Sequence, residues 1–463
     1  GMGDYSETNI QVDGVDEADI VKTDGQYLYL LREGEINIVK ADGAKTAEVG
    51  KIIQQSEGET GNSYRYASGM YLYGNVLAVV AQYGSWSYFD NGVSVGEDLN
   101  RAELLLYDIS NPAAPQLLDS FQQDGNYVDS RMTDGVVYLV STYYVYAPNE
   151  ETPELYIPKV CSDDGEELLA ADEIFLCPEP ASTSYSVVTS IDMEGDRRLS
   201  QQAVLGASSG CYMSRENLYL YGTSYVQEDS ESRQEAQYTV VDHTERVTTT
   251  LMRFALSDGM AVLEADGQVD GGLLNQFSLD EYNGYLRLAV TNNNWSYQIY
   301  TDDAYGFVNY VYPEDGYGQS NSLYILDQDL QTVGTLEGFG LDERIYSARF
   351  LGETGYVVTF RETDPLFAID LSDPQNPSLL SELKITGFSS YLHPYGEHML
   401  VGIGMEADPE TGATSGMKLS MFDISDPGDV AVLDTAQMDD TWSAVLYDHK
   451  AALIDAEDRK SVV

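Results

Sequence analysis

Short segments that alternate apolar and polar residues run along almost the whole chain, with turn residues between them. The segment "EINIVK" at residues 35–40 shows the pattern, and "KTDG" at 22–25 is typical of the breaks. Alternation with a period of two indicates strands that are buried on one face, and Gly, Asp and Asn mark the turns between them. We find no long segment with the 3.6-residue period of an amphipathic helix. The pattern predicts an all-β protein.

One order of strands repeats along the chain. A first strand, a turn with Gly, Asp or Asn and a second strand rich in Tyr, Val and Leu appear in "DSRMTDGVVYLVS" and again in "SARFLGETGYVVTF". A third strand that often ends in Asp, as in "ELLLYDISNP", is followed by a turn and a fourth strand. Seven such units are complete, and an eighth opens at Trp442 and stops at Val463. Four-stranded sheets repeated in this way predict a β-propeller.

The closure of the ring has three interpretations. We expect eight blades, with "NIQV" at residues 9–12 adding a strand to the last blade, and seven blades are the alternative. In the third interpretation the natural chain continues past Val463. We treat residues 9–463 as a single propeller domain and residues 1–8 as a flexible lead-in, in which a Gly before Met is typical of an expression scar.

The opening stretch "VDGVDEADIVKTDG" is crowded with carboxylates. Its second half aligns with residues 129–135, so "VKTDG" is an ordinary hairpin whose Asp-Gly supplies the positive φ of the turn. The first strands of a propeller line its channel, so we expect a cluster of charges there: Asp16, Glu17, Asp19, Lys22, Asp129, Arg131 and Arg349. Structural ion pairing is the favoured interpretation. A Ca²⁺ ion held by Asp13, Asp16, Glu17 and Asp19, or a catalytic carboxylate pair, are the alternatives.

Two further motifs have structural interpretations. The turns of the form D-[IL]-S-[DN]-P that begin at Asp108, Asp370 and Asp423 are expected to form through side-chain to backbone hydrogen bonds. Cys161 and Cys177 flank one irregular segment and are candidates for a disulfide if the chain is exported. The third cysteine, Cys211, is then expected to be a buried thiol.

Two long motifs resemble a known family. "TNIQVDGVDEADIVKTDGQYLYLL" and "YSARFLGETGYVVTFRETDPLFAIDLSDPQNPSLLSELKITGFSSYLHP" are similar to signatures of the bacterial secreted beta-propeller domain family, which is distantly related to WD-40 repeats. The resemblance covers the chain from Thr8 onward. It implies a propeller fold, export and a surface setting, and it implies no catalytic residues. Members of that family run beyond the point equivalent to Val463.

The charge of the chain limits its partners. Lys and Arg number 24 against 77 Asp and Glu, which gives a formal net charge of −53. Such a field repels nucleic acid and anionic lipid, because binding either requires cationic groups. It favours cations, basic partners and neutral ligands. The uncharged run at residues 66–89 is interrupted by Gly and Asn and predicts a strand pair rather than a membrane span. We expect a monomer.

The long insertions all fall between the second and third strands of their units. Propeller geometry places these loops on one face, and loops on a rigid scaffold often carry function. The loops are rich in aromatic residues, and the candidate ligand-binding residues are Tyr83, Trp86, Tyr88, Tyr143, Tyr144, Tyr146, Trp295, Tyr297, Tyr300, Tyr305 and Tyr310. Packing of the loops on one another, binding of a protein or peptide, and stacking on sugar rings are the three interpretations of this set.

The sequence contains no recognised catalytic motif, neither a nucleophile elbow nor an H-E-x-x-H zinc motif nor a phosphate-binding loop. We therefore predict an exported, non-enzymatic binding module that uses its insertion loops to hold a protein or glycan. The alternatives are a polymer-degrading hydrolase or lyase that uses the acidic cluster, and a surface scaffold without a dedicated ligand.

Overall fold

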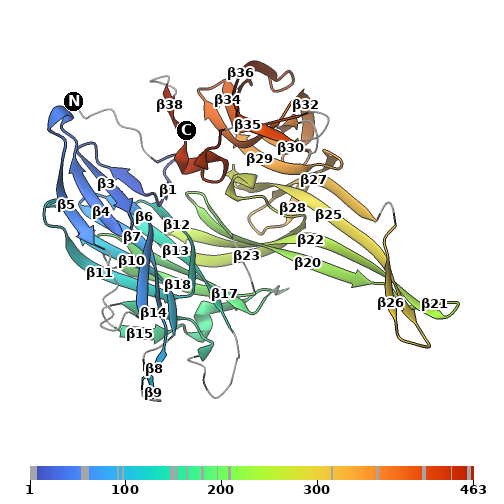
Figure 1. Ribbon diagram of the computed structural model, residues 1–463, viewed down its shortest axis with the longest axis horizontal. Coiled ribbons are helices and arrows are strands. Elements are labelled where there is room, and N and C mark those ends of the chain that lie inside the picture. Colours follow the sequence, from blue (N-terminus) through green and yellow to red (C-terminus); the bar gives the residue numbers. More distant parts are fainter. Residues whose placement is uncertain are drawn as a thin grey trace. The chain divides into compact units, whose positions relative to one another are not determined.

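The computed structural model is built from β-strands and a few short 3₁₀ turns, as the alternating pattern predicted (Figure 1). The residues that the structure describes are 8–53, 62–90, 93–95, 98–145, 152, 155–162, 165–178, 182–195, 197–206, 210–313, 316–360, 364–408, 413–439, 441–455 and 460–462. In these residues no helix is long and apolar enough to cross a membrane. The chain divides into two compact units, residues 1–221 with 252–264 and residues 222–251 with 265–463.

Unit 1 contains the first repeats as antiparallel four-stranded sheets. The first sheet is β2 (Val21–Thr23), β3 (Tyr27–Arg32), β4 (Glu35–Lys40) and β5 (Ala47–Ile53). The second is β6 (Ser63–Tyr73), β7 (Val76–Ser85), β10 (Leu99–Asp108) and β11 (Gln116–Asp124). The third is β12 (Asn126–Thr133), β13 (Val136–Tyr144), β17 (Ser184–Asp192) and β18 (Arg198–Leu205). Each sheet is one of the units that the repeat predicted.

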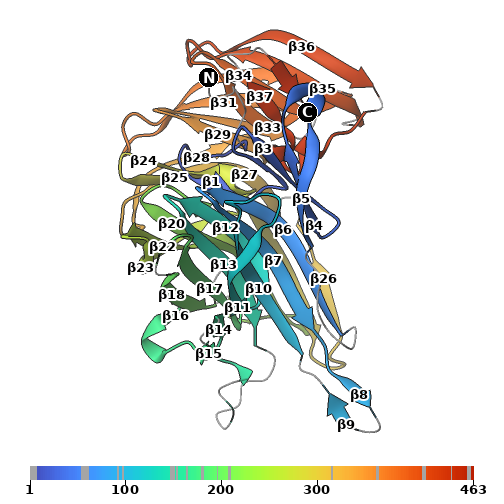
Figure 2. The ribbon, with the colours of Figure 1, turned by 90° about the vertical axis from the view of Figure 1, so that its left-hand side faces the viewer.

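The predicted insertions add short strands to these sheets. The hairpin of β8 (Tyr88–Asp90) and β9 (Val93–Val95) extends beyond the ends of β7 and β10 (Figure 2). The second insertion contributes β14 (Lys159–Ser162) and β15 (Gly165–Leu168) to the edge of β11, and β16 (Ile174–Leu176) to the edge of β18. At the other edge of that sheet, β1 (Asp16–Glu17) pairs with β12. The insertions therefore lie between second and third strands, as predicted.

The next two repeats are joined into one ten-stranded sheet. Its members are β19 (Gly210–Met213), β20 (Asn217–Asp229), β21 (Arg233–Glu235), β22 (Tyr238–Ser257), β23 (Met260–Asp270), β24 (Leu279–Tyr282), β25 (Tyr285–Asp302), β26 (Val308–Val311), β27 (Tyr317–Leu326) and β28 (Thr332–Phe339). The boundary between the two units falls within β20, β22 and β23. The two repeats are joined within unit 2, where residues 238–246 of β22 pair with residues 294–302 of β25. These long strand ends, with β21 and β26, form an extended arm (Figure 1).

The remaining repeats of unit 2 are separate sheets. One is β29 (Arg344–Leu351), β30 (Thr354–Phe360), β31 (Asp364–Asp370) and β32 (Ser378–Ile385), and the next is β33 (Phe388–Tyr395), β34 (Met399–Ala407), β35 (Thr414–Asp423) and β36 (Ala431–Asp439). The last strands are the pair β37 (Leu453–Asp455) and β38 (Lys460–Val462). The number of blades stays a prediction.

Neighbouring repeats pack on one another through one recurring contact. The D-[IL]-S-[DN]-P turn closes through its aspartate, since the amide of Ser110 donates to Asp108 Oδ1 at 2.8 Å. The turn then presses against the fourth strand of the preceding repeat, where a Cβ at Gly50 would lie 1.9 Å from the carbonyl oxygen of Pro112. Gly334 meets Pro374 in the same way in unit 2. The motif therefore forms the turn, as expected, and also packs one blade on the next.

Two expectations about the chain differ from the structure. Residues 9–12, expected to add a strand to the last blade, lie in no strand, and the first pairing of the chain is that of β1 with β12. Cys161 and Cys177 are thiols rather than a disulfide. Cys161 lies on β14, where its Sγ contacts Glu166 Oε2 at 3.7 Å, whereas Cys177 is buried in the core cluster of the following sheet. Cys211 is buried, as expected.

Candidate functional site

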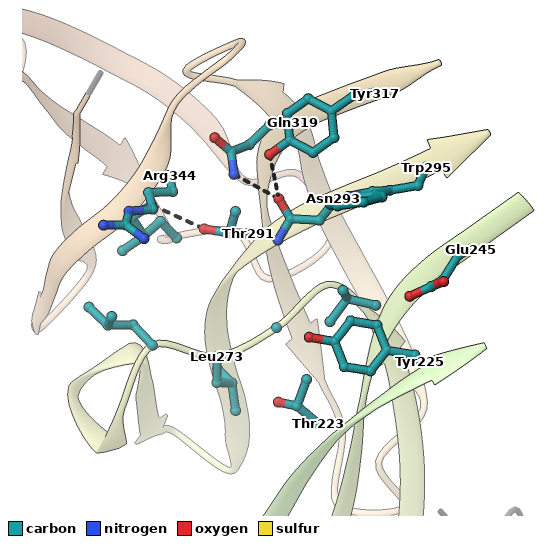
Figure 3. Close-up of a pocket in the computed structure, with 14 residues that line it drawn as sticks. Thr223, Tyr225, Glu245, Leu273, Thr291, Asn293, Trp295, Tyr317, Gln319 and Arg344 are labelled. Carbon is teal, nitrogen blue, oxygen red and sulfur yellow. Dashed lines mark hydrogen bonds between the residues drawn. The ribbon is translucent and has the colours of Figure 1, made fainter. Parts of the chain in front are cut away.

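A concave site lies in unit 2 at the base of the arm, and its side chains come from the neighbouring strands β20, β22, β25 and β27 and from β29 (Figure 3). In β25, alternate residues point to one side of a strand, which brings Thr291, Asn293 and Trp295 to the same face. Across the ladders Trp295 lies opposite Tyr317 of β27 and Glu245 of β22. The long pairing of β22 with β25 therefore builds the site from two different repeats.

The cavity has a volume of about 620 Å³. It is lined by Thr223, Tyr225, Glu245, Val247, Gly272, Leu273, Leu274, Thr291, Asn293, Trp295, Tyr317, Gln319, Arg344 and Ile345. This volume lies in the range of cavities that hold small ligands. We call it the arm groove.

Hydrogen bonds orient the amide groups of the arm groove. Gln319 Nε2 donates to Asn293 Oδ1 at 2.7 Å, and the Tyr317 hydroxyl donates to the same oxygen at 3.4 Å. These two bonds hold the Asn293 carboxamide so that its nitrogen points away from Tyr317 (Figure 3). Below them, the amide of Ile345 donates to Thr291 Oγ1 at 3.0 Å, which ties β29 to β25. The floor of the groove is therefore polar and held in place.

Large aromatic side chains form the walls of the arm groove and remain open to solvent. Trp295 is 51% exposed, Tyr317 52% and Tyr225 67%. The Trp295 and Tyr317 rings meet nearly at right angles, with centroids 5.6 Å apart. An edge-to-face pair of this kind contributes about 0.5–1.5 kcal/mol, so it favours one mutual orientation of the two rings. These aromatics are not buried by packing of the loops on one another.

One acidic and one basic side chain line the groove. In the part of the chain that the structure describes, no cation lies within ion-pair distance of Glu245. No carboxylate lies within that distance of Arg344 in the same residues. Arg344 also lines a second hollow of about 340 Å³, which shares Tyr317 and Gln319 with the first and adds Asp342, Tyr346 and Phe360. Because the two hollows share three lining residues, they are adjacent, and we refer to them together as the elongated groove.

The predicted aromatic residues separate into several environments. Of those in unit 2, Trp295 lines the groove, and Tyr297 packs on the Tyr310 ring at 5.9 Å farther along the arm. Tyr300 instead packs on Tyr238 at 5.9 Å, and Tyr305 is 79% exposed beyond the end of β25. The predicted residues of unit 2 thus share one insertion, but among them only Trp295 lines the cavity.

The other predicted aromatics belong to unit 1. Trp86 is 47% exposed and Tyr144 52%. Tyr143 packs on Tyr185, and its hydroxyl donates to the Leu155 carbonyl at 3.0 Å. The remaining members are Tyr83, whose ring lies 5.8 Å from the Arg65 guanidinium, Tyr88 in β8, whose side chain is not described, and Tyr146, which lies outside the described residues.

Sequence reasoning missed most residues of the arm groove. Tyr225 lies in the insertion at residues 223–247, and Asn293, Tyr317 and Gln319 lie in the insertion at residues 291–322. Their aromatic and amide types were a usable signal. Arg344 begins the first strand of the next repeat, and nothing in the local sequence connects it with the arm.

The acidic opening stretch is held by cations within unit 1. Lys22 Nζ lies 2.7 Å from Asp16 Oδ1 and donates to the Glu17 carbonyl at 2.9 Å. Arg131 pairs with Asp129. Burial raises the pKa of both aspartates, against the opposing effect of their cation partners. Asp16 and Asp129 are therefore engaged as ion pairs.

Two other members of the predicted charge cluster make different contacts. Asp19 accepts a hydrogen bond from the Ile20 amide at 2.7 Å, as Asp129 does from Ser130 at the equivalent step of the repeat. Arg349 belongs to unit 2, where its guanidinium lies 5.5 Å from the Phe277 ring.

The candidate calcium ligands do not form a cage in the described residues, which contain no group of three His, Cys, Asp or Glu placed to hold a metal. Asp13 Oδ2 instead lies 2.7 Å from the Arg215 guanidinium, and Asp16 is held by Lys22. Calcium binding by this stretch stays a prediction.

Comparisons with known proteins identify the family. The family model "Beta propeller domain" matches residues 5–463. An uncharacterised protein of Methanocaldococcus jannaschii is 30% identical over 97% of this chain and 72% of its own length. An uncharacterised protein of Archaeoglobus fulgidus is 30% identical over 98% of this chain and 74% of its own. Both relatives are archaeal, so the bacterial and exported character implied by the resemblance stays a prediction.

Two solved structures show limited similarity. An acylaminoacyl peptidase of Pyrococcus horikoshii matches with 11% identity and a TM-score of 0.27, over 80% of this chain and 52% of that one. BamB of Moraxella catarrhalis matches with 9% identity and a TM-score of 0.25, over 84% of this chain and 95% of that one. Neither supports an argument about function. The family match over residues 5–463, together with the two archaeal relatives, shows that this chain belongs to the beta propeller domain family.

Proposed function

We propose that this protein is a secreted or cell-surface binding module that holds a glycan chain in the arm groove. The observation that carries the proposal is the combination of exposed aromatic faces with fixed amides in one hollow. Trp295, Tyr317 and Tyr225 supply the faces, and Asn293 and Gln319 supply the amides. The elongated shape, which continues into the second hollow, suits a linear polymer better than a compact molecule.

The chemistry of sugars explains why this combination is selective. One face of a pyranose ring carries C–H groups and is weakly apolar, so it stacks on a flat aromatic surface. The hydroxyls around its edge need donors and acceptors, which carboxamides provide together. Glu245 adds a carboxylate that accepts hydrogen bonds from hydroxyls. A neutral or weakly charged glycan is also compatible with the net charge of −53.

A binding role rather than catalysis is supported by the state of the acidic cluster. Asp16, one of the carboxylates of the acidic opening stretch, is engaged by Lys22 in unit 1, and Asp129 of the same predicted charge cluster is engaged by Arg131. In a glycoside hydrolase, the two catalytic carboxyl groups must flank the glycosidic bond that is cleaved. We therefore assign these residues to stability.

The export of the protein is part of the proposal and rests on two observations. The long signatures at residues 8–31 and 346–394 resemble a secreted family, and the strongly acidic composition keeps an extracellular protein soluble. We propose that it acts as a monomer, with one arm groove per chain.

The test is binding of the purified protein to an array of glycans, cell-wall fragments and extracellular matrix proteins. Trp295→Ala is compared with Trp86→Ala, a matched control because the two tryptophans are 51% and 47% exposed and lie on different insertions. We expect glycan binding that is lost in Trp295→Ala and kept in Trp86→Ala.

Two results would argue against the proposal. Glycan binding that is indifferent to Trp295 would place the ligand elsewhere. Binding to proteins alone, lost when Tyr310 and Tyr312 on the exposed arm are replaced by alanine, would assign the arm rather than the groove as the working surface.

A further inference from the structure

Arg344 occupies the middle of the elongated groove. It lines both hollows, together with Tyr317 and Gln319, and it is the first residue of β29. Figure 3 shows its side chain beside Thr291, across the groove from Glu245. A ligand that runs from the first hollow into the second therefore passes the guanidinium.

The Arg344 guanidinium is held in place by an aromatic side chain. It lies over the Tyr346 ring, with its central carbon 4.8 Å from the ring centroid, and its Nη2 donates to the Tyr346 hydroxyl at 2.8 Å. Tyr346 is itself fixed by the Phe360 and Phe388 rings at 5.5 Å and 4.5 Å. A stacked guanidinium loses little additional freedom when it binds, so its remaining N–H donors are prepared for a ligand.

Most other arginines that the structure describes form ion pairs with carboxylates. Arg101 lies 3.0 Å from Asp124, and Arg253 lies 2.9 Å from Glu264. Among the described residues Arg344 has no such partner, although the chain has 77 acidic residues for 24 basic ones. An exposed cation that is fixed by stacking, in a ligand-sized groove of so acidic a protein, points to an anion supplied by the ligand.

We infer, on the basis of the proposed function, that the arm groove selects glycans that carry a carboxylate, and that Arg344 binds this carboxylate. A guanidinium donates two parallel N–H bonds to the two oxygens of a carboxylate, a geometry that a lysine cannot reproduce. Uronic acids present such a group at the edge of the sugar ring, while the face of the ring stays free to stack on Trp295.

The charge of the protein also limits how acidic the glycan is. Asp342 and Glu245 line the same elongated groove, and the net charge of −53 repels a densely charged polyanion. At physiological ionic strength the screening length is about 8 Å. The binding of one carboxylate in contact with Arg344 therefore depends mainly on that ion pair and less on the net charge of the protein. The ligand class is therefore a chain in which uronic acids alternate with neutral sugars.

The test uses hexasaccharides that alternate a uronic acid with a neutral sugar, each as the free acid and as its methyl ester. Esterification removes the charge and leaves the ring faces unchanged. Affinities are measured by isothermal titration calorimetry at two salt concentrations for the wild type, Arg344→Gln and Trp295→Ala. Arg32→Gln is the matched control, since Arg32 is exposed and lies in unit 1, outside the groove.

We expect the wild type and Arg32→Gln to bind the acids about tenfold or more tightly than the esters. Arg344→Gln is expected to lose this preference but to keep its affinity for the esters, whereas Trp295→Ala loses both. Equal binding of acid and ester by the wild type, or a preference that survives in Arg344→Gln, overturns the inference while the proposed function stands. No binding of any hexasaccharide by the wild type overturns the inference, and the array decides the proposed function separately.

Discussion

Replacement of Arg131 by methionine tests whether the buried charges of unit 1 are balanced by this cation. Arg131 is 5% exposed, pairs with Asp129 and donates to the Ser130 carbonyl at 2.7 Å. Its strand neighbour across the ladder is Glu17, which is 3% exposed. The change removes the positive charge and leaves the nearly buried Glu17 and the Asp129 carboxylate, which is 25% exposed, without this cation.

The magnitude follows from the cost of an uncompensated buried charge. Breaking a buried ion pair by removal of one partner costs about 3–5 kcal/mol of the free energy of unfolding. Burial already raises the pKa of Asp129, while Arg131 opposes the rise. Without Arg131 the pKa of Asp129 rises further, so the folded variant binds more protons than its unfolded chain above pH 4. The deficit of the variant at pH 7 therefore shrinks as the pH falls toward 5.

The assay is urea unfolding followed by near-ultraviolet circular dichroism, at pH 7 and pH 5, for Arg131→Met, Asp129→Asn and the double variant. The double variant is expected to recover part of the loss, because the unpaired carboxylate is gone. Arg215→Met is the control: its partner Asp13 is 99% exposed, so we expect a change within about 0.5 kcal/mol. Arg131→Met as stable as this control, or losses that simply add in the double variant, would refute the reasoning.

Three further outcomes are expected. Burial, with Arg349 nearby, lowers the pKa of His393 to about 4. Between pH 6.5 and 4 the unfolded chain therefore binds one proton more than the folded protein, and the free energy of unfolding falls as the pH falls. In His393→Gln this loss, on the order of 2–3 kcal/mol, should be absent from unfolding curves, and an unchanged pH profile would contradict it. Gly50→Ala forces a Cβ against the Pro112 carbonyl and should lower the free energy of unfolding by about 2 kcal/mol or more, whereas Gly318→Ala, with open space around it, should not. EDTA should leave the melting temperature unchanged, because cations of the chain already hold Asp13 and Asp16, and a large drop would instead support calcium binding.

The repeat and its hairpins could be predicted because their causes are local. Asp134 and Gly135 have φ angles of 49° and 78°, the left-handed conformation that aspartate tolerates and that glycine, without a Cβ, adopts readily in a tight turn. The aspartate of each D-[IL]-S-[DN]-P turn closes the turn with an amide two residues away. The insertions were located correctly because they interrupt an otherwise regular pattern.

Expectations that depended on distant partners were less successful. The spacing of Cys161 and Cys177 permitted a disulfide, but β14 and β16 join different sheets. Residues 9–12 have a strand-like pattern, but the structure forms no strand there. In both cases the local sequence was compatible with the expected disulfide or strand. Whether it formed depended on which remote segment each residue lies beside.

The sequence by itself determined the class of fold, the strand order within each repeat and the positions of the aromatic insertions, since alternation and turn chemistry act between close neighbours. Only the tertiary structure decided which aromatics share a site. The pairing of residues 238–246 with 294–302 brings Glu245 beside Trp295, and Arg344 arrives from the following repeat. These contacts join residues some 50 positions apart, and their register is selected by packing across whole sheets, which no local pattern encodes.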